Sequence, residues 1–74
     1  MKIIVLENTV EVTKVNCKYL PWRAVCVYFV RSDVDKNELG DRFEAVCYGD
    51  TKLKAHVLSV GRAYREGINK LYKD

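Results

Sequence analysis

The C-terminal third of the chain carries apolar residues at the period of a helix, and this feature most constrains the fold. The apolar positions follow one another at intervals of three and four residues, which places them on one side of a helix. Gly49 interrupts the chain before them, and Asp50 or Thr51 can cap a first turn. The pattern predicts a helix over residues 51–72 with this apolar stripe packed on a core. The apolar stripe consists of Leu53, Val57, Val60, Tyr64, Ile68 and Leu71.

Two glycines and a set of basic residues lie beside the apolar stripe. Gly61 and Gly67 each cost about 1 kcal/mol of helix propensity relative to Ala, and we expect them to allow a close approach between the helix and a sheet. A bend at Gly67 with fraying beyond it is the alternative. Residues 51–73 carry six Lys or Arg against one Glu, so the exposed face of the helix is basic and suited to phosphate or to an acidic protein face. A solvated helix surface is the alternative. The residues that could bind nucleic acid are Lys52, Arg62, Arg65, Lys70 and Lys73.

Upstream of the helix, the period of the apolar residues changes to two, as in half-buried strands. Residues 42–48 alternate in this way, and residues 22–31 are apolar at nearly every position, which is typical of a central strand. Pro21 has no N–H to donate and separates this strand from the one before it. The remaining strands are predicted at about 2–7 and 9–19.

Strands followed by one helix predict an α+β fold, with a small antiparallel sheet of three to four strands and the C-terminal helix packed on one face. A chain of 74 residues has room for one domain, residues 1–74. Its longest apolar run has seven residues, against about 20 for a membrane span. Glu7 and Asn8 interrupt the first apolar stretch before it reaches the length of a signal-peptide core. We therefore expect an intracellular, cytoplasmic protein that does not enter the membrane.

The three cysteines are an odd number, which argues against a disulfide framework. Cys17, Cys26 and Cys47 lie among apolar residues of the predicted strands, and we expect buried free thiols. The three could form a zinc site with His56, but zinc ligands usually come in close pairs on tight turns. Here the gaps are eight, twenty and eight residues, and we expect no metal.

Residues that could carry out catalysis are few. His56 is the one histidine, and no Cys or Asp stands at helical spacing to it. The carboxylate pairs Asp33 with Asp35 and Glu38 with Asp41 fall in a polar loop, where we expect solvated turn residues and not a desolvated catalytic pair. The four glycines are too scattered for a phosphate-binding loop. We expect no enzyme activity, no catalytic residue and no cofactor.

One face of the predicted sheet has no helix to cover it. If Phe43, Ala45 and Cys47 meet the helix, the opposite face shows Arg42, Glu44 and Tyr48. The neighbouring strand adds either Trp22, Cys26 and Tyr28 or Arg23, Val27, Phe29 and Arg31. Both registers expose aromatic and Arg side chains, the types most enriched in interfaces. Alternatively, the N-terminal strands fold over this face, or a homodimer buries it. The candidate partner-binding residues are Trp22, Arg23, Tyr28, Phe29, Arg42 and Tyr48.

Two functions agree with these features. In the first, the chain is a small regulatory protein that docks on a larger protein, as many virus-encoded inhibitors of host enzymes do. In the second, it binds DNA or RNA through the basic helix residues or the arginines of the sheet. The protein partner is the leading hypothesis, and nucleic acid is the alternative.

A resemblance supports the second function. Over about 50 residues the chain resembles the DNA-binding domains of the AP2 type and the arm-binding modules of phage integrases, which have three strands and a helix. In those families the sheet enters the major groove, which implies DNA contacts from the sheet. The acidic loop 33–41 departs from the basic hairpin expected near DNA. The segments that carry the resemblance are Trp22-Arg23-Ala24-Val25, Arg42-Phe43, Tyr48-Gly49-Asp50, Ala55 and Arg62-Ala63.

Overall fold

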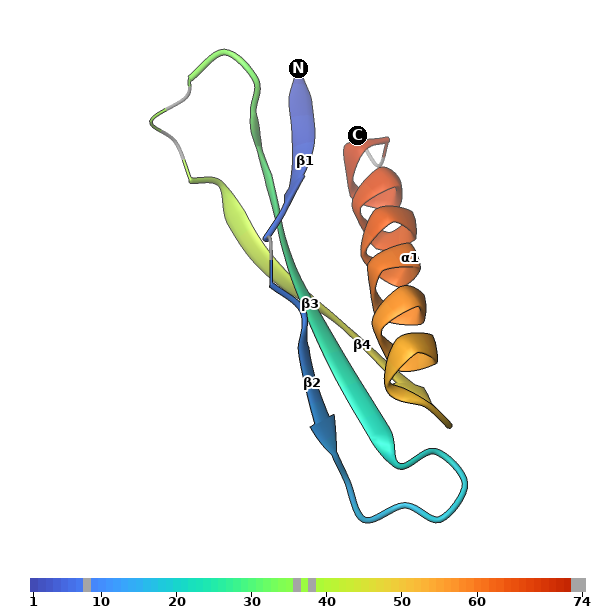
Figure 1. Ribbon diagram of the computed structural model, residues 1–74. Coiled ribbons are helices and arrows are strands. Elements are labelled where there is room, and N and C mark those ends of the chain that lie inside the picture. The colour runs from blue at the N-terminus through green and yellow to red at the C-terminus, as the bar shows by residue number, and fades with distance from the viewer. Residues whose placement is uncertain (8, 36, 38, 73–74) are drawn as a thin grey trace.

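The computed structural model describes residues 1–7, 9–35, 37 and 39–72. It contains one antiparallel sheet of four strands and one C-terminal helix that lies across one face of the sheet (Figure 1). The predicted α+β fold class is therefore confirmed. The elements are β1 (Lys2–Leu6), β2 (Glu11–Lys14), β3 (Trp22–Ser32), β4 (Asp41–Gly49) and α1 (Lys52–Leu71).

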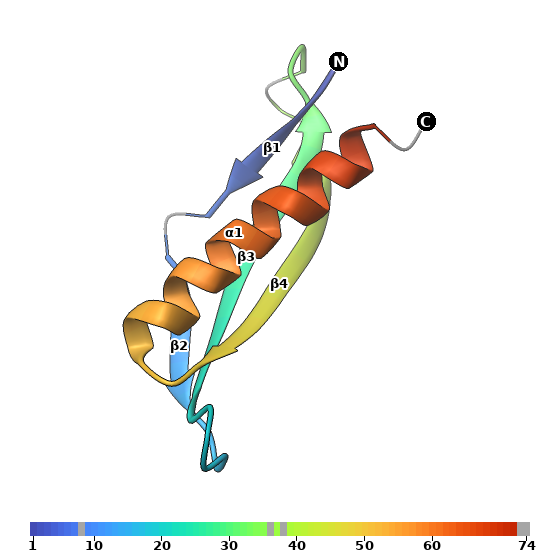
Figure 2. The same ribbon diagram turned by 90° about the vertical axis from the view of Figure 1, so that its right-hand side faces the viewer.

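β3 is the centre of the sheet. β4 pairs with one of its edges along nearly the whole length, from Trp22 opposite Gly49 to Val30 opposite Asp41. β1 and β2 both pair with β3 and follow one another along it, β1 at its C-terminal half and β2 at its N-terminal half. Figure 2 shows β1 and β2 on one side of α1 and β4 on the other. The sheet is thus three strands wide, with one edge divided into two short strands.

The second strand is shorter than the predicted 9–19. β2 ends at Lys14, and the chain then turns, with the Val15 N–H donating to the Pro21 carbonyl at 2.7 Å. β3 begins at Trp22, directly after the proline. Cys17, at the tip of this turn, is exposed, so the expectation of a buried thiol is wrong at this position.

The helix begins as its capping residues predict. Thr51 is the N-cap, and its hydroxyl accepts a hydrogen bond from the Lys54 N–H at 3.1 Å. The residues of α1 that are buried against the sheet are all small, and they recur every four positions. They are Ala55, Ser59, Ala63 and Gly67.

The predicted orientation of the helix is therefore wrong. The apolar stripe does not face the sheet: Tyr64 is 49% exposed and Ile68 is 46% exposed. Of the apolar stripe, only Val60 and Leu71 pack against the core, and both are partly buried. The reason is geometric, because small side chains let the helix axis approach the sheet more closely than large ones do.

The core lies between β3, β4, β1 and α1. Tyr28 is fully buried at its centre, and its ring stacks on that of Phe43 with centroids 5.4 Å apart. Cys26, Val30 and Ala45 complete the sheet's contribution. The helix in the described part of the chain does not combine the length and the apolar character that crossing a membrane requires.

Candidate functional site

The strand register decides which side chains face away from the helix. Residues directly opposite each other on paired strands project to the same face, and Tyr28, Cys26 and Ala45 define the helix side. The odd-numbered residues of β3 therefore project from the other side, together with the even-numbered residues of β4. We call this surface the open face. Its members are Ile3, Val5, Glu11, Thr13, Arg23, Val25, Val27, Phe29, Arg31, Arg42, Glu44, Val46 and Tyr48.

No element of the described chain covers the open face. β1 and β2 pair edge to edge with β3 and stay in the plane of the sheet, and α1 lies on the opposite side (Figure 1). The alternative in which the N-terminal strands fold over this face is therefore wrong.

An apolar row runs along the middle of the open face. Val25 and Val27 are 9% and 8% exposed. Phe29 continues the row and is partly exposed. Val46 lies beside Val25 on β4, and Val5 lies beside Phe29 on β1. The centre of the face is therefore a shallow apolar strip.

Charged and aromatic side chains surround this strip. Arg23 and Arg31 stand near the two ends of β3, with Arg23 opposite Tyr48. Arg42 Nη1 pairs with Glu44 Oε1 at 2.9 Å, and both side chains are about half exposed. Such a surface pair contributes only about 0.2–1 kcal/mol, so its geometry can change when another molecule binds.

Four of the six predicted partner-binding residues lie together on the open face: Arg23, Phe29, Arg42 and Tyr48. The other two are corrected. Tyr28 is fully buried in the core, and the side chain of Trp22 projects to the helix side, where it contacts Lys52. Side chains alternate along a strand, so neighbours in sequence could not share one face.

Two of the basic helix residues contact aromatic rings of the sheet. Lys52 Nζ lies 4.9 Å from the centroid of the Trp22 ring. Lys70 Nζ lies 4.5 Å from the centroid of Phe43 and 5.8 Å from that of Tyr28. An ammonium group over an aromatic face is held there by the ring quadrupole. These two lysines are therefore engaged within the fold.

Arg62 is engaged as well. Its Nε lies 3.2 Å from Glu66 Oε1, and its Nη1 donates to the Val46 carbonyl at the edge of β4 at 3.1 Å. The hydrogen bond to Glu66, followed by one to Cys47, raises the pKa of the guanidinium. Arg65 is exposed, and Lys73 lies outside the described residues. Of the predicted basic residues that the structure describes, Lys52, Lys70 and Arg62 each make a separate contact within the fold.

The sequence reasoning missed some members of the open face. Val46 is apolar at a position where the alternation of residues 42–48 calls for a polar residue. It lies beside Val25 on the open face. Ile3 and Val5 reach this face through the pairing of β1 with β3. The continuous apolar character of residues 22–31 was the available signal, since a strand that is polar on one side alternates.

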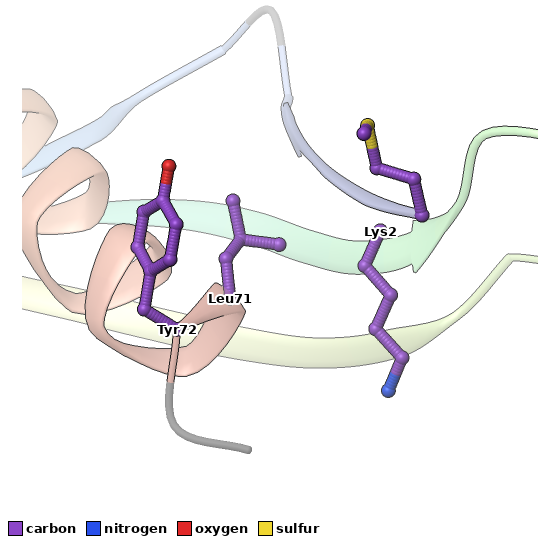
Figure 3. A pocket seen from close by; sticks show the side chains of 4 residues that line it. Lys2, Leu71 and Tyr72 are labelled. Atoms are coloured by element: carbon purple, nitrogen blue, oxygen red, sulfur yellow. The ribbon is translucent and has the colours of Figure 1, made fainter.

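Other parts of the molecule offer less to a ligand. Within the described residues, no three His, Cys, Asp or Glu side chains gather into a group that could hold a metal ion. A hollow of about 510 Å³ lies between the end of α1 and the start of β1. Figure 3 shows Leu71 and Tyr72 on its helix side and Lys2 on the opposite side. Among the described residues that line it, there is no carboxylate, histidine or cysteine.

No family model matches the chain, and no curated protein or solved structure is significantly similar to it. These comparisons therefore add no support to the resemblance to three-stranded DNA-binding domains, which depends only on the sequence segments that carry it.

Proposed function

We propose that this chain is a non-catalytic regulatory protein that docks on a larger protein through the open face. The observation that carries the proposal is the open face itself, a sheet surface with an apolar centre that no described element covers. Arginine and tyrosine at its margin are the residue types enriched at interfaces. Docking would inhibit the partner if the open face covers the partner's active site.

The chemistry of the open face defines the partner. Its apolar row requires an apolar patch on the other side, and Arg23 and Arg31 require carboxylates near both ends of that patch. β3 has 11 residues, which extend about 36 Å. A standard interface buries about 800 Å² on each side, and a face of this length can supply much of it. The partner is therefore a folded protein with an apolar patch bordered by acidic residues.

Nucleic acid fits the same surface less well. Glu44 lies among the arginines and pairs with Arg42, so carboxylates would face the phosphates. The ammonium groups of the helix lysines Lys52 and Lys70 lie over aromatic rings of the sheet. Strong phosphate binding needs several cationic groups that reach the backbone together.

The experiment is site-specific photo-crosslinking in extract of the native cell. A photoreactive phenylalanine analogue replaces Tyr48, which is 45% exposed on the open face, or Leu58, which is 48% exposed on the helix. We expect a discrete protein adduct from position 48 and none from position 58. Arg31→Glu should reduce the adduct at least tenfold, because it reverses one end of the charged border.

The opposite results would overturn the proposal. Equal adducts at both positions would indicate non-specific capture. A second arm measures the anisotropy of labelled duplex and single-stranded oligonucleotides at about 50 mM salt. Binding that weakens with a log–log slope near −0.9 per phosphate contact, and that Arg31→Glu abolishes, would assign the open face to nucleic acid.

A further inference from the structure

The apolar stripe of α1 is a second unpartnered surface, and it lies away from the open face. Leu53 is 72% exposed and Val57 is 57% exposed, while Tyr64 and Ile68 are each about half exposed. Four large apolar side chains exposed in one line offer on the order of 400 Å², within the 300–600 Å² range of the largest patch on a typical monomer. Patches of this size usually mark an interaction site.

The order of residues in the apolar stripe is symmetric. Its midpoint falls between Val60 and Gly61, and Leu53 and Ile68 stand equally far from that midpoint on either side. Val57 and Tyr64 are equally spaced from it as well. A helix with this symmetry can pair with a second copy of itself in the antiparallel direction, so that each residue meets its mirror position.

We propose that a second copy of this chain covers the apolar stripe, forming a two-fold antiparallel pair of α1 helices centred between Val60 and Gly61. In this register Leu53 meets Ile68 of the second copy and Val57 meets Tyr64 of the second copy. Each of these contacts occurs twice, as a two-fold interface requires. Intervals of three and four residues also suit helices that cross at about +20°.

Gly61 lies where the two helices cross. A Cβ added at this position would have no atom within 4 Å, so the fold of a single chain gives no reason for a glycine there. At the centre of a helix pair, a residue without a side chain lets the axes approach to the lower end of the usual 8–10 Å. The dimer explains a residue that otherwise only weakens the helix.

The surroundings of the apolar stripe fit a second copy. A hollow of about 400 Å³ beside Leu53 is lined by Val12, Lys52 and His56. In the proposed register, Ile68 of the second copy comes opposite Leu53, next to this hollow. The cation nearest the other margin, Lys54, already pairs with Asp50 at 3.3 Å, which reduces repulsion between the copies.

The area of contact sets the strength of the pair. With about 400 Å² from the apolar stripe of each copy, the two copies together bury on the order of 800 Å². This is below the roughly 1,200 Å² at which standard interfaces begin, so the pair is a weak one. We expect a dissociation constant on the order of 10–100 µM, which makes the dimer dependent on concentration. Because both copies carry a net charge of +3, added salt should strengthen it through screening.

Sedimentation velocity of the full chain from about 5 to 500 µM tests the proposal. The wild type should pass from monomer to dimer in this range. Val57→Lys and Tyr64→Glu should each weaken the dimer at least tenfold, because each places a charge against an apolar residue. The combined variant should return to within about threefold of the wild type, since a lysine at 57 then faces a glutamate at 64 twice. Leu58→Lys adds the same charge outside the apolar stripe and should change nothing.

Three results would overturn the proposal: a wild type that stays monomeric to 500 µM, a dimer that survives both single variants, or a combined variant that stays monomeric. Circular dichroism checks that each variant is folded. As a second measurement, Gly61→Cys in a Cys17→Ser chain should form an intermolecular disulfide faster than Leu58→Cys in the same chain. None of these variants touches the open face, so the outcome is independent of the proposed docking function.

Discussion

Gly67 of α1 lies against Ile4 of β1 so closely that a Cβ added at Gly67 would stand 2.7 Å from Cδ1 and 2.9 Å from Cγ1 of the isoleucine. Carbon atoms in ordinary contact are about 3.5–4.0 Å apart. This is the tight end of the row of small residues that faces the sheet. The helix therefore lies close to the sheet because its buried face carries no large side chains. The larger side chains of α1 lie to the side of this helix–sheet contact.

The two helix glycines provide a matched comparison. Gly67→Ala gains about 1 kcal/mol of helix propensity but crowds Ile4, and overpacking of this kind costs about 1–3 kcal/mol. We expect a net loss of about 1 kcal/mol. Gly61→Ala meets open space and should gain about 0.5–1 kcal/mol. Urea unfolding at low micromolar protein concentration measures the change in the free energy of unfolding for both variants. Equal changes at the two positions would contradict the close packing of Gly67 against β1.

The orientation of the helix can be tested through its two competing faces. Ala63 is fully buried and Leu53 is 72% exposed. Ala63→Leu should lower the free energy of unfolding by about 1–3 kcal/mol, because the extra carbons have no space. Leu53→Ala should stay within about 0.5 kcal/mol, as is usual for exposed positions. The reverse order in thermal or urea unfolding would mean that the apolar stripe faces the sheet.

The sheet could be predicted from sequence because its signal is carried by side chains of contrasting polarity. The alternation of Phe43, Ala45 and Cys47 with polar neighbours identified the helix side of β4, and the structure confirms it. Of the two registers considered for β3, the one that exposes Arg23, Phe29 and Arg31 is correct. The choice between the two registers depends on how β3 pairs with its neighbouring strands. The sequence of one strand alone does not determine that pairing.

The position of the helix in the sequence was predicted correctly, but the face that it buries was not. Hydrophobic periodicity weighs large apolar side chains, whereas Ala55, Ser59 and Ala63 contribute almost nothing to such a pattern. Their spacing of four residues was visible, but its meaning depends on a sheet that comes close enough to use it. The large residues of the apolar stripe then stay exposed and can be covered by another molecule.

The thiols should differ in reactivity and in their effect on stability. Cys17 is exposed, whereas Cys26 is 1% exposed, and burial together with the charge of Glu7 raises the pKa of its thiol above the ordinary value of 9.0. Cys17 should react with a disulfide reagent in the native protein, and Cys26 should react only after unfolding. Equal rates for the two in native buffer would contradict the burial of Cys26.

The raised pKa of Cys26 also sets a pH dependence. Because the unfolded chain loses this proton at a lower pH than the folded chain, the contribution to stability is complete below about pH 9. It is lost as the pH rises from there through the raised folded-state value. The urea midpoint of the wild type should therefore fall more between pH 8 and 10 than that of Cys26→Ala. Parallel slopes in the two proteins would show that another group controls the decline.

Lys70 separates a structural role from a nucleic-acid role for the basic helix face. Its ammonium group lies 4.5 Å from the centroid of Phe43. Lys70→Gln keeps the helix propensity but removes the charge, and it should lower the free energy of unfolding by about 0.5–1 kcal/mol. Arg65→Gln, at an exposed position of the same helix, is the matched control and should change stability by less than about 0.5 kcal/mol. If Lys70→Gln leaves the urea midpoint unchanged and instead removes binding to oligonucleotides, the lysine belongs to a phosphate-binding surface, and the basic helix face regains the function that its composition predicted.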